Sequence, residues 1–250
     1  MTDRPSASIT ALQEMVSEAV VVVGFTGAGI STESGVPDFR SPNSPWMRHK
    51  PIDFQIFLHS EEARREAWRR KFAMDDLYRG VRPNSGHLGL AALVASGRMP
   101  AVITQNIDGL HQASGLSDDQ VVELHGNGTY AKCLTCQRAY DLGWIRSRFE
   151  ASGDPPACEA CGGILKSATI SFGQAMPEMA MRRARRLALS CDLFLVAGSS
   201  LLVYPAAAFP GLAKENGARL VIINREATPL DGIADLVIHE EIGSVLSVFV

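Results

Sequence analysis

Four of the five cysteines in this 250-residue chain stand in two Cys-x-x-Cys pairs. Cys133 and Cys136 form the first pair, 21 residues follow, and Cys158 and Cys161 form the second. This spacing is typical of a zinc ribbon, in which four thiolates surround one Zn2+ in a closed tetrahedral shell. A closed shell leaves no open position for chemistry, so we expect one structural zinc ion. A redox pair or two disulfides are the alternatives for the same residues.

A second candidate site is a glycine-rich turn. The apolar run Val20–Phe25 leads through one threonine into Gly27, Ala28 and Gly29. Glycines let the backbone approach a pyrophosphate, and a helix that starts there offers its N–H groups to the phosphates. The spacing differs from the dehydrogenase pattern Gly-x-Gly-x-x-Gly, because Thr32 occupies the third glycine position. A tight turn without a ligand is the alternative interpretation.

Polar residues stand at the ends of four apolar runs. Ligands of an open α/β sheet collect beyond the carboxyl ends of its strands, so we expect these residues to share one crevice. His125 is the candidate general base among them, because an imidazole titrates at about pH 6.5 and can accept a proton at neutral pH. Each residue taken alone is better explained as a loop residue or a helix cap, so the prediction depends on the whole set. The set comprises Gln105, Asn106, Asp108, His125, Ser199, Ser200, Asn224 and Glu226.

The elements that must position these residues are short apolar runs separated by helical patterns. Near-continuous Val, Ile and Leu runs are typical of strands buried on both faces, as in a parallel sheet covered by helices. Segments 85–97 and 205–217 are expected to be crossover helices, each ending at a glycine that suits a left-handed C-cap. The alternation predicts an α/β fold with a doubly wound, mostly parallel, Rossmann-like sheet. The runs span residues 19–25, 100–106, 121–124, 168–172, 192–198, 219–224 and 235–238.

Two stretches depart from this alternation. Residues 41–84 are rich in Pro, Trp and charge, and we expect them to form a helical insert that includes a cofactor loop. Residues 131–166 contain both cysteine pairs and the turn-forming segment GDPPACEACGG, and we expect a small zinc-binding lobe there. The Rossmann-like domain would then comprise residues 1–40, 85–130 and 167–250.

Composition limits the class of protein. The net charge of −3 is too small to indicate capture of nucleic acid or of an anionic membrane. The N-terminus MTDRPSASIT has no apolar core of a signal peptide, and the apolar runs are far shorter than the roughly 20 residues of a membrane helix. Five cysteines are too few for a disulfide-stapled secreted fold. We therefore expect a soluble, cytoplasmic monomer without nucleic-acid or membrane partners.

Five sequence blocks together resemble the sirtuins, the family of NAD-dependent protein deacylases, in a bacterial-type form. The resemblance runs from about residue 12 to residue 246, and it implies an enzyme that uses NAD and holds one structural zinc. Such an enzyme removes an acyl group from protein lysine and releases nicotinamide and O-acyl-ADP-ribose. Acetyl is the first candidate for the acyl group. The blocks are GAGISTESGVPDFR (27–40), TQNIDGLHQASG (104–115), ELHGN (123–127), AGSSLLVYPA (197–206) and INRE (223–226).

The resemblance also implies roles for single residues. His125 would be the base that activates a ribose hydroxyl, and catalysis would also involve Asn106 and Asp108 at the nicotinamide and its ribose. The cofactor-binding residues would be Gly27, Ala28, Gly29, Asp38, Phe39, Arg40, Gln105, Asn106, Ile107, Asp108, Gly198, Ser199, Ser200, Asn224, Arg225, Glu226 and Ile242.

In sirtuins the substrate peptide pairs as a strand between two loops. The matching substrate-binding residues are Ile170, Phe172, Gly173 and Gln174 in one loop and Val203 and Tyr204 in the other. Many members of the family carry Glu at the position of Gln174, so this chain has one negative charge fewer near the peptide.

The sequence does not determine which acyl group is removed. The desuccinylating branch of the family carries Tyr and Arg three positions apart, where this chain has Trp68 and Lys71, so desuccinylation is not assigned. Removal of a longer acyl group and protein mono-ADP-ribosyl transfer are the alternatives within the same cofactor chemistry. NAD binding without turnover is a third, and it would release no nicotinamide.

Overall fold

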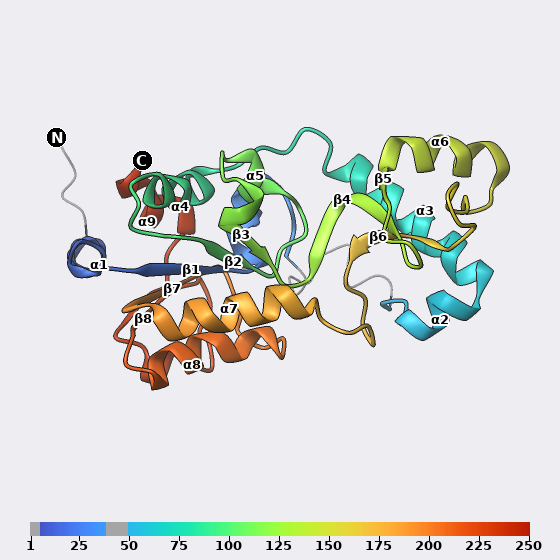
Figure 1. The fold of residues 1–250 in the computed structure, drawn as a ribbon. Helices are drawn as coiled ribbons and strands as arrows, with labels where there is room; N and C mark the ends of the chain where they lie inside the picture. The colour runs from blue at the N-terminus through green and yellow to red at the C-terminus, as the bar shows by residue number, and fades with distance from the viewer. Residues whose placement is uncertain (1–5, 39–49) are drawn as a thin grey trace.

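The main sheet of the molecule contains six strands in the order β3-β2-β1-β7-β8-β9, and all neighbouring strands are parallel (Figure 1). The structure is a computed structural model, and it describes residues 6–38 and 50–250. The order reverses between β1 and β7, which places the switch point of the sheet beyond the carboxyl ends of these two strands. The predicted doubly wound sheet is thereby confirmed. The strands are β1 (Val22–Thr26), β2 (Val102–Thr104), β3 (Val121–Glu123), β7 (Leu193–Ala197), β8 (Arg219–Ile223) and β9 (Leu236–Ile238).

Helices cover both faces of this sheet. One face packs against α1 (Ala7–Glu18), α4 (Ser85–Ala95) and α9 (Ile242–Leu246), and the other packs against α7 (Glu178–Ser190) and α8 (Phe209–Glu215) (Figure 1). Successive residues of a strand point to opposite faces, so each central strand must be apolar at nearly every position. This requirement explains the near-continuous Val, Ile and Leu runs of the sequence.

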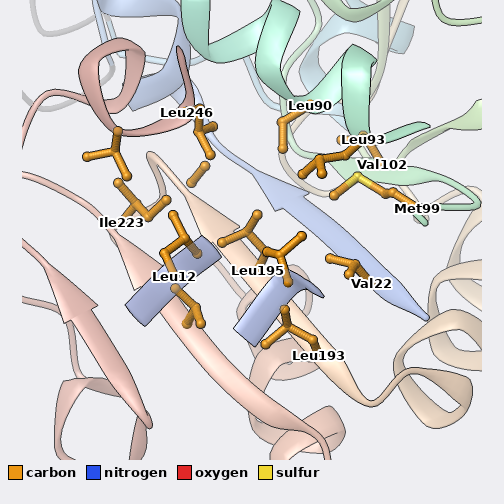
Figure 2. Packing of buried hydrophobic residues seen from close by; sticks show 14 of the residues in the cluster. Leu12, Val22, Leu90, Leu93, Met99, Val102, Leu193, Leu195, Ile223 and Leu246 are labelled. Atoms are coloured by element: carbon orange, nitrogen blue, oxygen red, sulfur yellow. The ribbon is translucent and has the colours of Figure 1, made fainter. Parts of the chain in front are cut away.

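The core on the first face is made mostly of aliphatic side chains from helices and strands far apart in the sequence. Figure 2 shows Leu12 of α1 and Leu90 of α4 facing Leu195 of β7, and all three are fully buried. Burying a leucine side chain stabilises the folded state by about 1.5–3 kcal/mol. This packing fixes the strands, and with them the positions of the residues that follow their carboxyl ends.

A second, antiparallel sheet has the order β5-β4-β6 and lies beside α3 and α6 (Figure 1). Trp68 stacks on Phe72 with ring centroids 5.5 Å apart, and both rings pack against the core of this sheet. Arg146 of α6 donates two hydrogen bonds, of 2.7 and 2.8 Å, to the carboxylate of Asp76 at the end of α3. The elements are α2 (Phe54–His59), α3 (Glu61–Leu77), β4 (Gly126–Cys133), β5 (Ala139–Asp141), α6 (Leu142–Ser152) and β6 (Leu165–Thr169).

Short helical turns complete the described part of the chain, and none of its helices is long and apolar enough to span a membrane. The predicted glycine C-caps are confirmed, since Gly97 and Gly217 follow α4 and α8 with φ angles of 78° and 95°. The short elements are η1 (Ala28–Ser34), α5 (Leu110–Ala113), η3 (Asp118–Gln120), η4 (Ala206–Ala208), η5 (Asp231–Ile233) and η6 (Ser247–Phe249).

One predicted strand of the main sheet is wrong. The run 168–172 does not join the parallel sheet; β6 ends at Thr169 and pairs antiparallel with β4. None of these five residues is buried, and Phe172 is 67% exposed, so the run lacks the two covered faces of a central strand. Short apolar runs do not by themselves distinguish a central strand from a strand that leads into an exposed loop.

Candidate active site

The glycine turn interlocks with the end of β7. Gly29 N donates to the carbonyl of Gly198 at 2.8 Å, and Gly27 N donates to the carbonyl of Ala197 at 3.3 Å. A Cβ at Gly29 would lie 2.7 Å from the Cα of Gly198, and one at Gly198, where φ is +70°, would lie 2.2 Å from Ile30 N. The glycines are therefore required by backbone contact between the two strand ends at the switch point.

Ser31, Asn106 and Asp108 form a hydrogen-bonded group beside this turn. Ser31 Oγ donates to Asp108 Oδ2 at 2.7 Å, and Asn106 Nδ2 donates both to Ser31 Oγ and to the carbonyl of Gly27 at 3.1 Å. Asp108 Oδ1 also accepts from Leu110 N at 3.0 Å. The structure thus brings the two predicted nicotinamide residues, Asn106 and Asp108, next to the glycine turn.

Two buried histidines lie behind this group. His87 and His111 have ring centroids 5.1 Å apart; His87 Nε2 lies 3.5 Å from Ser31 Oγ, and His111 Nε2 lies 2.8 Å from Thr26 Oγ1. Burial lowers the pKa of His111 to about 3 and that of His87 to about 4, although the charge of Asp108 raises the latter. Both rings are therefore neutral at pH 7.

His125 lies in the turn between β3 and β4, and it is held by a main-chain carbonyl. Its Nδ1 is 2.9 Å from the carbonyl oxygen of Gln105. A carbonyl only accepts, so Nδ1 carries the proton and Nε2 of the neutral ring keeps its lone pair. Burial lowers the pKa of His125, and the bond to Gln105 opposes this shift. The ring is thus a neutral base at pH 7.

Gln105 connects His125 with the end of β7. While its carbonyl accepts from His125, its Nε2 donates to Ser199 Oγ at 2.8 Å. Its own N–H donates to the carbonyl of Thr26 at 3.0 Å, which ties it to β1. Direct hydrogen bonds therefore join residues at the ends of β1, β2, β3 and β7. Of the residues predicted to share one crevice, this group includes Gln105, Asn106, His125 and Ser199.

The residues after β8 form a separate group at the same edge of the sheet. Asn224 Nδ2 donates to the carbonyl of Glu226 at 2.7 Å, and Arg225 pairs with Glu241 at 3.5 Å. Ile242 begins α9 and contacts the turn, since a Cβ at Gly198 would lie 2.8 Å from its Cδ1. Among the described residues, no hydrogen bond joins Asn224, Arg225 or Glu226 to the His125 group.

Five further residues were predicted to bind the cofactor. Asp38 lies at the end of the first described range, and Phe39 and Arg40 lie outside the described residues. Ile107 lies in the loop after β2, and its carbonyl accepts from Gly128 N at 2.7 Å. Ser200 follows Ser199 and is half-buried.

The two predicted substrate loops expose large apolar side chains. Phe172 is 67% exposed, Tyr204 is 70% exposed and Val203 is 41% exposed. Phe54 N donates to the carbonyl of Phe172 at 2.9 Å, and Gln174 Oε1 accepts from Ser171 N at 3.1 Å, so the first loop is held from both sides. Exposed aromatic side chains next to a site of this kind are typical of a surface that binds another polypeptide.

The structure also locates the two residues compared with the desuccinylating branch. Trp68 is 2% exposed and belongs to the core of the second sheet. Lys71 pairs with Asp75 one turn along α3. Neither side chain is available to hold the carboxylate of a succinyl group.

The four paired cysteines form the candidate metal centre. Their sulfur atoms all lie within 4.8 Å of one another, and the distance from Sγ to Sγ is 3.5 Å for Cys133 and Cys161 and 3.6 Å for Cys136 and Cys158. A tetrahedral shell with Zn–S bonds of about 2.3 Å places sulfurs about 3.8 Å apart. The spacing therefore fits Zn2+, and all four thiols are free, which excludes the disulfide alternative in this structure.

Hydrogen bonds to sulfur support the same assignment. Thr135 N and Cys136 N lie 3.4 and 3.5 Å from Cys133 Sγ, and Tyr140 Oη donates to Cys158 Sγ at 3.1 Å. Donors directed at sulfur stabilise thiolates, the form that binds metal. Zinc would thus tie together the two ends of the segment that contains β5 and α6.

Several buried polar residues of the site were not predicted from the sequence. Ser31 stands inside the glycine block and His87 inside a PNSGH segment that reads as a helix start. Lys166 is a third, and nothing in its local sequence indicates burial. Ser31 and His87 lie 56 positions apart along the chain, so local spacing does not reveal that they are neighbours in the site.

The set of donors at the switch point fits a dinucleotide. The N-terminus of η1 has no side-chain cap, because its N-cap is Gly27. Amide and hydroxyl groups of Gln105, Asn106 and Ser199 converge beside it. Backbone N–H groups suit phosphates, and side-chain amides and hydroxyls suit ribose and carboxamide groups.

Comparison with known proteins agrees with this geometry. The model of the Sir2 family matches residues 27–205. The chain is 56% identical over 245 residues to an NAD-dependent protein deacetylase of Rhodopseudomonas palustris, covering 98% of this chain and 97% of the relative. It is 55% identical over 244 residues to NAD-dependent protein deacetylase 1 of Bradyrhizobium diazoefficiens, covering 98% and 96%.

Solved structures give the same result. A structure of Sir2 with a p53 peptide and NAD+ has a TM-score of 0.83 at 36% identity and covers 95% of each chain. A structure of Sir2Tm bound to a propionylated peptide has a TM-score of 0.84 at 35% identity, again covering 95% of each chain. The matches extend over nearly the whole chain. This chain therefore belongs to the Sir2 family, the sirtuins.

Proposed function

We propose that this protein is an NAD-dependent protein-lysine deacylase whose first substrate group is acetyl. The observation that carries the proposal is the neutral His125, whose Nε2 lone pair is left free at the switch point by the bond from Nδ1 to Gln105. Curated relatives at 55–56% identity are named NAD-dependent protein deacetylases, which supports the same activity. NAD, when bound, would supply the ribose that receives the acyl group, with loss of nicotinamide.

Some residues of the site would transfer a proton, and others would bind and orient the cofactor. His125 Nε2 would take a proton from a ribose hydroxyl, and the carbonyl of Gln105 would stabilise the imidazolium through Nδ1–H. Asn106 and Asp108 would orient the nicotinamide end, because Ser31 fixes both side chains. The carboxylate of Asp108 would favour positive charge that develops nearby.

The remaining predicted residues would hold the rest of the dinucleotide. Gly27, Ala28 and Gly29 would accommodate the pyrophosphate, with Ser199 and Ser200 opposite. Asn224, Arg225, Glu226 and Ile242 would hold the adenosine end, where Arg225 is already oriented by Glu241. Asp38, Phe39 and Arg40 would complete the cofactor loop.

The protein substrate would bind across the exposed aromatic loops. Ile170, Phe172, Gly173 and Gln174 would pair with one edge of an extended peptide, and Val203 and Tyr204 with the other. A structure of a Sir2 relative holds a propionylated peptide, so a slightly longer acyl group is the natural second candidate. The buried position of Trp68 and the ion pair of Lys71 give no support to desuccinylation.

We also propose that the protein works as a cytoplasmic monomer without a nucleic-acid partner. Five free cysteines, four of them in a thiolate metal site, suit a reducing compartment. The net charge of −3 gives no general attraction for polyanions. Light scattering after gel filtration measures the mass directly, and a dimer would refute the monomer.

The function is tested with NAD and peptides that differ only in the acyl group on one lysine. The expected products, identified by mass spectrometry, are free lysine peptide, nicotinamide and O-acyl-ADP-ribose. An ADP-ribose adduct on protein without peptide deacylation would support mono-ADP-ribosyl transfer instead. If no peptide causes release of nicotinamide, NAD binding without turnover is the remaining interpretation.

The role of His125 is tested with His125→Ala. We expect kcat to fall by about 100-fold or more, because a positioned general base contributes roughly that factor. His59→Ala is the matched control, since His59 is exposed on α2 and, among the described residues, bonds only to the carbonyl of Gln55. Circular dichroism and zinc content should stay unchanged in both variants. Near wild-type deacylation by the first variant would refute the assignment.

A further inference from the structure

Lys166 is a buried cation on β6, the strand that leads from the zinc site to the first substrate loop. The residue is 4% exposed, whereas Lys132, its cross-strand neighbour on β4, is half-buried. Lys166 Nζ donates to the carbonyl of Thr169 at 2.6 Å and to that of Ser167 at 3.3 Å. In the part of the chain that the structure describes, no carboxylate forms an ion pair with it.

Burial of this ammonium group opposes folding. Removing a charged amine from water costs several kcal/mol, and two neutral carbonyls compensate less well than a carboxylate. The cost is visible in the pKa of Lys166, which burial lowers to about 8. An apolar side chain of the same length would satisfy the packing, so general stability does not account for a lysine here.

The two carbonyls lie where the regular ladder between β4 and β6 stops. Cys133 pairs with Leu165, Lys132 with Lys166, and Ala131 with Ser167. The next pair is Gly126 with Thr169, so β4 advances five residues while β6 advances two. Across this irregularity the regular antiparallel ladder is interrupted, and the side chain of Lys166 supplies a bond to the last carbonyl of β6.

That last carbonyl lies between the candidate base and the substrate loop. Ile170, the residue after Thr169, donates its N–H to the carbonyl of His125 at 2.8 Å. A Cβ at Gly126 would lie 2.1 Å from the carbonyl oxygen of Ala168, so the two backbones are in direct contact. A shift of the end of β6 would therefore move both the backbone of His125 and the loop from Ile170 to Gln174.

We propose that Lys166 is a positioning residue for the acyl-lysine substrate. Its ammonium group replaces the missing ladder bonds, fixes the carbonyl of Thr169, and so sets the distance between the substrate loop and His125. The inference rests on the proposed deacylase function, because it assigns the loop after β6 to the peptide. It concerns the use of the peptide, and the glycine turn and Ser199 of the proposed dinucleotide site lie on other strands.

The test is Lys166→Met, which keeps a long apolar stem and removes the ammonium group. We expect kcat/KM for the acetylated peptide to fall at least tenfold, while the KM for NAD, the zinc content and the free energy of unfolding match or exceed wild type. Lys132→Met is the matched control, because it removes a cross-strand ammonium that makes no bond to the loop, and it should keep wild-type kcat/KM. Lys166→Gln, whose amide still donates a hydrogen bond, should recover part of the loss.

Two outcomes would overturn the inference. One is wild-type kcat/KM in Lys166→Met. The other is that both Lys166 variants lose stability and NAD affinity to the same extent as they lose peptide turnover. That result would show that Lys166 has a structural role only. Wild-type protein in the same assay separates this failure from failure of the function, since a wild type that removes no acyl group refutes the deacylase itself.

Discussion

At the scale of single residues, the chemistry of the site depends on how one imidazole is oriented. His125 has a fixed tautomer because a carbonyl of the neighbouring strand end occupies Nδ1. Its environment is partly buried, which disfavours the imidazolium. Both effects prepare Nε2 to accept a proton from a substrate hydroxyl at neutral pH.

The lowered pKa of His125 predicts the pH dependence of turnover. The neutral ring is the active form, so kcat/KM should rise with pH through the pKa of His125 and level off above it. Because burial lowers this pKa, the midpoint of the rise should lie below about 6.5, the value of an unperturbed imidazole. The measurement is kcat/KM with acetylated peptide from pH 5 to 8, in steps of half a unit. Enzyme held at each pH and assayed at neutral pH serves as the control for inactivation, and a midpoint clearly above 6.5 contradicts the assignment.

At the scale of elements, the glycine turn and the end of β7 behave as one unit. Gly29 and Gly198 approach so closely that neither tolerates a side chain without backbone movement. Packing alone therefore explains why glycine is required at both positions. Contacts between strand ends fix the turn that we propose accepts the pyrophosphate.

Gly29→Ala tests this coupling. The added Cβ would lie 2.7 Å from a main-chain atom of Gly198, so we expect the free energy of unfolding to fall by about 1–3 kcal/mol and the KM for NAD to rise. Gly211→Ala in α8 is the control, because nothing lies within 4 Å of its Cβ. The control should change stability by about 1 kcal/mol or less, in the stabilising direction. An unchanged KM for NAD in Gly29→Ala would contradict the placement of the pyrophosphate.

We expect the second sheet to depend on a bound metal for part of its stability. Its apolar core is small, and two of the cysteines, Cys133 and Cys158, belong to it. A domain with so small a core commonly needs a cross-link or a metal.

Removal of zinc should therefore unfold the second sheet and abolish deacylation. Metal analysis should give about one zinc ion per chain for the protein as purified. Cys158→Ser should lose the metal, whereas Cys191→Ala should keep it, because Cys191 is a lone buried thiol away from the cluster. Full activity in protein shown to be free of zinc would refute the structural role of the metal.

At the scale of the whole molecule, buried neutral histidines connect stability to pH. His111 is 1% exposed and His87 is fully buried, and both are neutral in the folded protein at pH values where the unfolded chain is already protonated. The folded state therefore binds fewer protons than the unfolded state between about pH 6.5 and the folded pKa values. The contribution of these two histidines to the free energy of unfolding is fully present above about pH 6.5, and it is lost as the pH falls through this window.

His111→Gln tests this linkage through a slope. Each such histidine should contribute about 1.4 kcal/mol per pH unit to the fall in the free energy of unfolding between pH 6 and 4.5. We expect urea titrations of His111→Gln to show a slope smaller by that amount, while the exposed-site control His59→Gln keeps the wild-type slope. Loss of zinc at low pH affects all three proteins alike and cancels in the comparison. Equal slopes would show that His111 does not titrate in this way.

The sequence predicts the main sheet well because its strands obey a simple physical rule. Strands β1, β7 and β8 are covered on both faces, so they appear as unbroken apolar runs. The strands β4 and β5 pack only one face on a small core, so their sequences mix polar and apolar residues. They contain no unbroken apolar run that would identify them as strands. The run 168–172 shows the reverse error, since apolar residues there serve an exposed loop.

The family, the use of NAD, the zinc-binding cysteines and the deacylase activity follow from the sequence, because each depends on residue types at short, fixed spacings. Tertiary structure alone decides the tautomer of His125, the group of Ser31, Asn106 and Asp108, and the burial of Lys166. The bonds of His125 and of the Ser31 group join residues far apart along the chain, and the burial of Lys166 depends on the packing around it. Distances in space decide both, and local spacing does not contain them.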